Sequence, residues 1–190
     1  MKALSPAVAK VLKRLHYPLE IMLVCVRWYV AYPLSLRNLE EMMAERGIAV
    51  DHSTVHRWAI KLLPVLEKAF RRCKRPVGKS WRVDETYVKV RGTWKCLYRA
   101  VDKAGNTVDF LLRAKRDKEA ARRYFERAID QNGAPETVTI DKSGANLKDF
   151  RCARILLSGI ELMHMIAKGQ MKDADKFEPS AAQQFYSLAI

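Results

Sequence analysis

The sequence lacks the cysteine spacing of a zinc-binding or disulfide-linked protein. Its four cysteines, Cys25, Cys73, Cys96 and Cys152, lie far apart and form no C-x-x-C pair. Zinc sites and disulfide frameworks in small proteins usually show closely and regularly spaced cysteines. The sequence therefore predicts neither, and reduced thiols are expected.

Long apolar runs are also missing. The most apolar run, residues 21–26, lies between Glu20 and Arg27, whereas a membrane-spanning helix needs about 20 apolar residues. Residues 1–17 are basic, but they contain neither the apolar core nor the small-residue cleavage site of a signal peptide. We therefore expect a cytoplasmic protein with no membrane partner.

Acidic residues are scarce relative to basic ones. The 190 residues include 21 Asp and Glu against 35 Lys and Arg, so the net charge is +14. This balance favours a polyanionic partner, most simply a nucleic acid. Ribosomal and membrane-surface proteins share this charge balance.

The first third of the chain has the pattern of three helices. Residues 19–32 are almost continuously apolar, which predicts a buried helix that Pro33 stops. Ser35 is a suitable N-cap for a second helix ending at Gly47, and Ser53 is a suitable N-cap for a third. The last two are short, amphipathic and joined by a glycine-containing connection, which predicts a helix-turn-helix.

In a helix-turn-helix the second helix enters the major groove of DNA. The side chains that point away from its apolar stripe, and that we expect to contact DNA, are Thr54, His56, Arg57 and Lys61. The alternative is an ordinary helical hairpin whose polar residues face water. The basic excess favours the DNA-binding interpretation.

A basic segment follows the third helix. Residues 68–79 contain six Lys or Arg and end around Pro76 and Gly78, which is typical of a domain boundary. The segment is either a solvated connector or a contact to the phosphate backbone of DNA. For the second case the candidate DNA-binding residues are Arg71, Arg72, Lys74 and Arg75.

Residues 80–90, SWRVDETYVKV, are rich in β-forming residues and predict a strand that carries Asp84 and Glu85. A buried carboxylate costs several kcal/mol unless a partner such as a metal ion pairs with it. Neighbouring strand residues face opposite sides of a sheet, so these two acids cannot serve one site. One is expected to be catalytic and the other to pair elsewhere.

Three more strands and a helix are predicted after this strand. The strands span 94–102, 107–114 and 136–140, and the helix, capped by Asp117 and ended by Asn132 and Gly133, precedes the last strand. This order is the RNase H-like arrangement, a mixed α+β and α/β fold. The helical crossover between the third and fourth strands allows these two to be parallel neighbours.

Two acids can meet if the first and fourth strands lie side by side. Asp84 lies inside the first strand and Asp141 at the end of the fourth. Carboxylates at one end of a sheet can hold two Mg²⁺ ions, which clamp the oxygens of a phosphodiester during cleavage or transfer. Asp102 and Asp109 are expected to be turn residues or caps.

Four segments carry a resemblance to a known family. They are GKSWRVDETYVKVRG (78–92), LYRAVD (97–102), VTIDKSGAN (138–146) and GIELMHMI (159–166). They closely resemble bacterial insertion-sequence transposases of the IS-six family, over nearly all of residues 17–170. The resemblance implies a helix-turn-helix that binds terminal inverted repeats, and an RNase H-like DDE domain that nicks DNA and joins the freed 3′-hydroxyl to a target. Asp84 and Asp141 match the family's first two catalytic acids, with Mg²⁺ or Mn²⁺ as cofactor.

The third acid of the family is absent from its usual place. In the family a long stretch with an Asn-Asn-Ile-Val-Glu-Gln-Asp-His-type motif follows Ser-Gly-Ala-Asn, whereas here Leu147 runs directly into Lys148. An in-frame internal deletion near 147/148 explains this, and impaired catalysis is expected. Glu161 is expected on a polar stripe of a helix over 150–168, solvated or ion-paired, and not as a replacement ligand. His164 and the Met163/Met165 pair are expected to pack.

The sequence thus predicts three parts. They are a helix-turn-helix DNA-binding domain over 1–75 with a basic linker to 79, a truncated RNase H-like DDE domain over 80–170, and a loose polar tail over 171–190. The expected function is Mg²⁺-dependent DNA transposition by a homo-oligomer acting on double-stranded DNA, both element ends and target. The alternatives are a non-catalytic DNA-binding regulator and an RNase H-like nuclease that uses only two acids.

Overall fold

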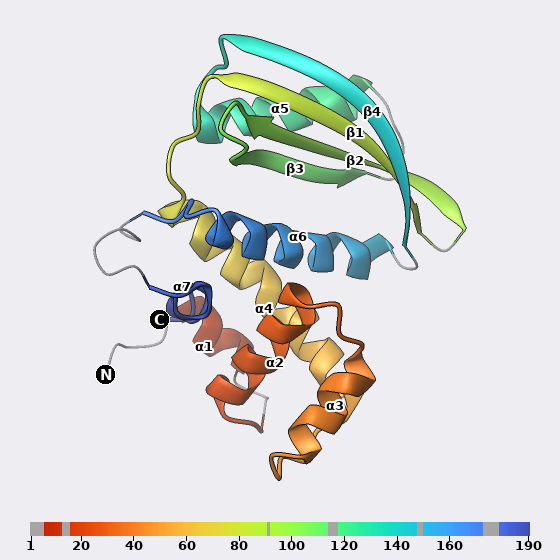
Figure 1. Cartoon of the computed structure of the whole chain (residues 1–190), viewed down its shortest axis with the longest axis vertical. Helices are drawn as coiled ribbons and strands as arrows, with labels where there is room; N and C mark the ends of the chain where they lie inside the picture. Colours follow the sequence, from red (N-terminus) through yellow and green to blue (C-terminus); the bar gives the residue numbers. More distant parts are fainter. Residues whose placement is uncertain (1–5, 13–15, 91, 114–117, 148–149, 173–178) are drawn as a thin grey trace. The chain divides into compact units, whose positions relative to one another are not determined.

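The computed structural model describes residues 6–12, 16–90, 92–113, 118–147, 150–172 and 179–190. The chain forms two compact units, Met1–Lys74 with Ile155–Ile190 and Arg75–Arg154. The first unit is helical, and the second contains a four-stranded sheet and a helix (Figure 1). The residues from Ile155 onward belong to the first unit, whereas the sequence placed 155–170 in the RNase H-like domain.

The first unit contains α1 (Pro6–Leu12), α2 (Leu19–Ala31), α3 (Leu36–Ala44), α4 (His52–Cys73), most of α6 (Phe150–Ala167) and α7 (Ala181–Ser187). Helix α2 follows the prediction closely because its almost continuous apolar run is buried at Met22, Cys25 and Val26. Ser35 caps α3 through a complete capping box with Asn38.

Helix α4 is longer than predicted. Its N-cap is Asp51, not Ser53, and its 22 residues run to Cys73, so residues 68–73 are helix rather than linker. The apolar stripe explains the extension, because Trp58, Leu66 and Phe70 are all buried along it. Burial of this continuous apolar face stabilises the helix through residues 68–73, although the clustered charge of this segment predicted a domain boundary.

The polar stripe predicted on α6 is wrong at two of its positions. Ser158 and Glu161 are only 5% and 8% exposed. Met163 and Met165 are buried as expected, but His164 is exposed and does not pack. Close approach to other helices explains the burial: a Cβ atom added at Gly159 would lie 2.8 Å from Leu63 of α4 and 2.9 Å from Val30 of α2.

The end of the chain is not the loose tail that its polar composition predicted. Helix α7 begins with a capping box between Ser180 and Gln183. Phe185 and Ala189 are fully buried, and the Arg27 side chain of α2 donates a hydrogen bond of 3.1 Å to the Tyr186 hydroxyl. A few apolar side chains therefore dock this helix on the first unit.

The second unit contains β1 (Ser80–Val90), β2 (Thr93–Asp102), β3 (Thr107–Arg113), α5 (Lys118–Asn132) and β4 (Thr137–Leu147). The strand order is β3-β2-β1-β4, with β1 antiparallel to β2 and parallel to β4. The first and fourth strands lie side by side, as a meeting of Asp84 and Asp141 requires. The third and fourth strands are not the neighbours that were expected, because β2 and β1 lie between them. This mixed α/β unit fits an RNase H-like DDE domain.

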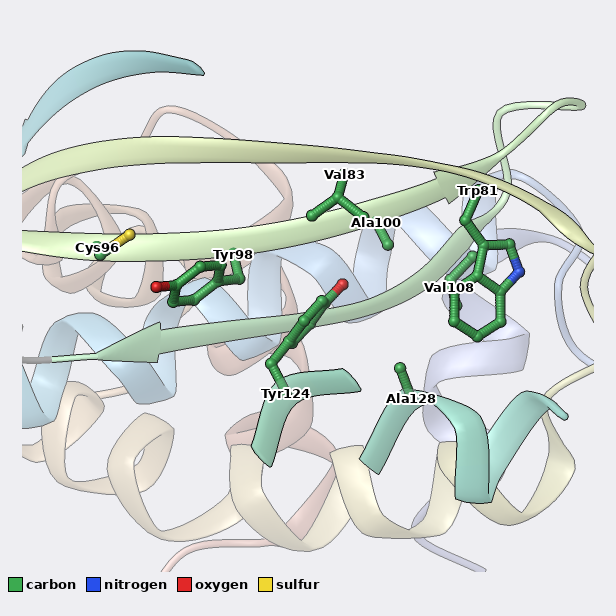
Figure 2. Packing of buried hydrophobic residues seen from close by; sticks show 8 residues of the cluster. All are labelled: Trp81, Val83, Cys96, Tyr98, Ala100, Val108, Tyr124 and Ala128. Atoms are coloured by element: carbon green, nitrogen blue, oxygen red, sulfur yellow. The ribbon is translucent and has the colours of Figure 1, made fainter. Parts of the chain in front are cut away.

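Helix α5 covers one face of the sheet (Figure 1). Figure 2 shows Tyr124 and Ala128 of α5 pointing at side chains of the strands, including Val83 and Ala100. The Tyr98 and Tyr124 rings stack with centroids 5.7 Å apart. Ile129 of α5 is 38% exposed. The predicted cap Asp117 lies outside the described residues.

Two aspartates of the sheet stabilise the fold. Asp102 accepts hydrogen bonds from the backbone N–H groups of Gly78 and Asn106, as expected of a turn residue. Asp109 was also expected in a turn or cap, but it lies within β3, is 1% exposed and pairs with Arg127 of α5 at 2.7 Å. Its ion pair offsets the cost of burying a carboxylate.

Candidate functional site

Asp84 lies near the middle of β1, between two paired strands. Its register partner in β2 is Arg99, and its register partner in β4 is Asp141. The Asp84 side chain is half-buried. The two acids that the sequence selected, 57 positions apart (141 − 84), thus stand level on adjacent parallel strands.

Asp84 and Glu85 serve opposite faces of the sheet. Trp81 and Val83 belong to the core that α5 covers, and Glu85 shares their alternation and is 7% exposed. Asp84 lies on the other face, as the two-residue period of a strand requires. Of these two neighbouring acids, only Asp84 is on the face that carries the register position of Arg99.

Strand β4 is longer than predicted, so the position of Asp141 within it differs. The strand was expected to end at Asp141, but it continues to Leu147, and each of its residues has a register partner in β1. The long β1 edge offers backbone hydrogen-bonding groups as far as Val90, and this pairing outweighs the weak β-propensity of Ser143, Gly144 and Asn146. The two aspartates therefore lie within the strands and not at a sheet end.

The donor chemistry at this level of the sheet fits a hard divalent cation, because Mg²⁺ and Mn²⁺ prefer carboxylate oxygens. Within the part of the chain that the structure describes, no group of three or more His, Cys, Asp or Glu side chains is arranged to hold a metal ion. The Asp141 side chain lies outside the described side chains. Glu161 belongs to the other unit and is buried there.

Helices α3 and α4 are joined by a short connection with defined contacts. Gly47 adopts a positive φ of 71°, which a residue with a side chain rarely does. The Tyr17 hydroxyl donates a 2.7 Å hydrogen bond to the Ala49 carbonyl, and the His52 N–H donates one of 3.2 Å to the Glu40 carboxylate. These contacts fix the start of α4 relative to α3.

The N-terminus of α4 carries a chain of hydrogen bonds. The Asp51 carboxylate accepts from the Ser53 N–H and from the Thr54 hydroxyl, each at 2.7 Å. Hydrogen bonds from Ser53 and Thr54 hold the pKa of Asp51 well below its ordinary value. The Arg57 guanidinium in turn donates to the Thr54 hydroxyl at 2.7 Å. Arg57 is exposed, and this hydrogen bond restrains its guanidinium.

The other predicted DNA-binding residues differ in exposure. Lys61 and Arg72 are exposed, whereas His56, Lys74 and Arg75 are half-buried. Arg71 is half-buried and donates two hydrogen bonds to the Glu67 carboxylate, at 2.9 and 2.8 Å. Arg71 is thus tied to its own helix.

An exposed basic row runs along α4. Arg57, Lys61, Lys68 and Arg72 follow one another at spacings of four, seven and four residues and are all exposed. Such spacings place side chains on one face of a helix. The sequence prediction assigns Lys68 to a linker and not to this row, although its i, i+4 spacing to Arg72 indicates a shared helix face.

No helix in the described ranges combines the length and the apolar character needed to cross a membrane.

Comparison with known proteins adds independent information. Residues 78–148 match a family model described as a DDE domain. That match ends beside the 147/148 junction at which the sequence predicts a deletion. The match also contains both β1 and β4, and therefore Asp84 and Asp141.

Curated relatives include two staphylococcal proteins. The transposase for insertion sequence-like element IS431mec of Staphylococcus aureus (strain Mu50) is 40% identical over 124 residues, which are 65% of this chain and 55% of that protein. The transposase for insertion sequence element IS257 in transposon Tn4003 of Staphylococcus aureus is 39% identical over 124 residues, which are also 65% of this chain and 55% of that protein. An uncharacterised protein of Yersinia pseudotuberculosis is 33% identical over 94 residues, 43% of this chain and 88% of that protein.

The chain spans about half the length of the staphylococcal transposases that it matches. Together, the DDE-domain match, the identity to these transposases and a sheet that fits the DDE domain show that the chain belongs to the IS-six family of DDE transposases.

Proposed function

We propose that this chain is a DDE transposase with impaired catalysis, which binds double-stranded DNA at the ends of an insertion sequence and holds Mg²⁺ or Mn²⁺ with Asp84 and Asp141. The observation that carries the proposal is the parallel register of β1 and β4, in which Asp84 and Asp141 are partners. The DDE-domain match over the same strands supports it.

In this proposal the α3–α4 pair acts as a helix-turn-helix. The N-terminus of α4 presents Arg57, whose guanidinium is held by Thr54 and is suited to bidentate contacts with a base or a phosphate. The remaining cations of the exposed row, Lys61, Lys68 and Arg72, extend along a helix of 22 residues, about 33 Å. They would contact phosphates without reading sequence.

The catalytic half of the proposal assigns roles to three residues. Asp84 and Asp141 would supply carboxylate oxygens to the metal, which in such enzymes polarises the phosphate and lowers the pKa of the attacking group. Arg99, the register partner of Asp84 in β2, places a cation across from the carboxylate. That charge would attract the DNA phosphate.

Impaired catalysis follows from the missing third acid. Strand β4 ends at Leu147 and α6 begins at Phe150, so no segment with the family's third acid intervenes. With two carboxylates the metal pair loses a charged ligand, and losses at catalytic groups commonly reach several powers of ten in rate.

A mobile element has two ends, so the proposal includes a homo-oligomer that holds both.

The test combines DNA selection with a nicking assay on the full chain. Duplexes are selected from a random library, and nicking of the selected duplex is followed in Mg²⁺ and Mn²⁺. We expect convergence on one sequence and slow nicking that Asp84→Asn and Asp141→Asn each abolish. Asp130→Asn, at an exposed acid of α5, is the matched control and should leave nicking unchanged. Nicking that survives both site substitutions would contradict the catalytic assignment.

The alternative function is a non-catalytic DNA-binding regulator. It is favoured by the packing of α3 and α4 with α1 and α2 in a unit separate from the sheet. Sequence-specific binding without any metal-dependent nicking, in wild type and variants alike, would support it over the enzyme.

A further inference from the structure

A pocket of about 320 Å³ opens on the sheet beside the level of Asp84. Arg82 lines it, and its register partners Val101 of β2 and Thr139 of β4 line it too. Arg82 precedes Asp84 by two residues on the same strand, so the two lie on the same face, about 6.6 Å apart along the strand. The pocket therefore adjoins the proposed catalytic position.

The polar lining of the pocket is mainly cationic or hydroxylic. Arg82 and Lys103 are exposed, and Ser80 and Thr139 add exposed hydroxyl groups. Among the residues that the structure describes, neither cation forms an ion pair. Small-molecule pockets are usually lined mostly by apolar groups, whereas two cations with hydroxyl donors are suited to an anion.

One acid, Asp102, also lines the pocket, but its carboxylate is already bonded. It accepts from the Gly78 N–H at 2.9 Å, the Asn106 N–H at 2.8 Å and the Asn106 side-chain amide at 3.0 Å. These donors turn its oxygens toward the β2–β3 turn and the segment before β1. Arg82 and Lys103 remain available to a ligand.

We propose that Arg82 and Lys103 bind a phosphodiester group of the DNA strand, next to the phosphate that lies at Asp84, and so position that strand for reaction. This inference rests on the proposed function. Arg82 and Asp84 are about 6.6 Å apart along the strand, close enough for nearby phosphates of one DNA strand to reach both.

The test uses the full chain and a single-stranded thymidine trinucleotide with a 5′-phosphate, without metal, followed by NMR. Signals of Ser80, Lys103, Gly105 and Thr139 are expected to shift, because all four residues line the pocket. The R82Q/K103Q variant should bind at least about tenfold more weakly, since it loses charge-assisted hydrogen bonds. R82K, which keeps a cation at position 82, should bind the trinucleotide more tightly than R82Q/K103Q does.

The matched control is R122Q/R123Q, which removes the same charge from two exposed positions of α5. It should bind the trinucleotide as the wild type does. Shifts confined to other residues, or equal affinities for R82Q/K103Q and R122Q/R123Q, would overturn the inference. The shifts in the wild-type chain decide the location even if R82Q/K103Q does not fold.

Failure of this inference can be told from failure of the proposed function. A chain that nicks DNA through Asp84 but does not bind the trinucleotide in this pocket would overturn the pocket assignment alone. A chain that binds the trinucleotide here but shows neither metal binding nor nicking would retain the pocket and overturn the catalytic assignment.

Discussion

Asp84 of β1 and Asp141 of β4 are register partners in a parallel pair, while Glu85, the residue next to Asp84, lies on the face that α5 covers. Of the neighbouring acids Asp84 and Glu85, only Asp84 therefore lies on the open face of the sheet. It is level with Asp141, which is distant in the sequence. Backbone pairing between β1 and β4 fixes this relationship along all eleven residues of each strand.

Replacement of Arg57 by glutamine is expected to weaken binding of a selected duplex about tenfold, because an exposed guanidinium held by Thr54 would be lost. If Arg57 contacts a phosphate, the slope of log affinity against log salt should also decrease by about 0.9. Fluorescence anisotropy over a series of salt concentrations measures both quantities.

Arg123→Gln provides the charge-matched control for this prediction, since Arg123 is an exposed cation of α5. Thr54→Val should reproduce part of the Arg57 effect by removing its anchor while keeping the cation. Equal losses for Arg57→Gln and Arg123→Gln would show that only net charge matters, against a binding role for α4.

Replacement of Gly159 by alanine is expected to destabilise the first unit. The added Cβ would meet Leu63 at 2.8 Å and Val30 at 2.9 Å, and overpacking typically costs about 1–3 kcal/mol. Alanine's higher helix propensity offsets about 1 kcal/mol of that cost. Urea unfolding should therefore show a lower midpoint.

A double-mutant cycle separates this clash from other effects. Leu63→Ala removes the atoms that the new Cβ meets, so its cost should be smaller in the Gly159→Ala background than in the wild type. The expected coupling free energy is about 0.5–3 kcal/mol. Strictly additive costs would contradict the close approach of α6 to α4.

Replacement of Asp102 by asparagine is expected to destabilise the sheet unit by about 1–3 kcal/mol at neutral pH, because an amide offers one acceptor oxygen where the carboxylate offers two. Burial acts to raise the pKa of Asp102, but hydrogen bonds from Gly78 and Asn106 outweigh it and hold the pKa below the ordinary 3.8.

The pH dependence follows from the direction of that shift. A lowered pKa in the folded state adds stability that is fully present above the unfolded value of 3.8 and is lost as pH falls through the folded value. The difference in unfolding free energy between wild type and Asp102→Asn should thus be constant near neutral pH and shrink below pH 3.8. A difference independent of pH would contradict the ionised carboxylate.

Local patterns predicted most elements of the fold. The β-forming run of residues 80–90 and the capping residue Ser35 gave β1 and the start of α3, because each depends on nearby residues only. Alternation along β1 also predicted that Asp84 and Glu85 face opposite sides. The helical crossover between β3 and β4 predicted these two strands as parallel neighbours, but β2 and β1 separate them in the sheet.

Features that depend on tertiary contacts escaped prediction. The length of β4 depends on pairing with β1, and the burial of Glu161 and Ser158 depends on how closely α6 approaches its neighbours. The pocket around Arg82 and Lys103 joins three strands with a turn, and no spacing in the sequence indicates it. In each case the partner is distant along the chain.

The most direct test of the central claim is a Mn²⁺ titration of the full chain followed by NMR. If Asp84 and Asp141 share a bound ion, the amide signals flanking both residues should broaden together at the same Mn²⁺ concentration, and Asp84→Asn should abolish the broadening around both. Broadening at only one of the two strands, or broadening unchanged in Asp84→Asn, would contradict the account.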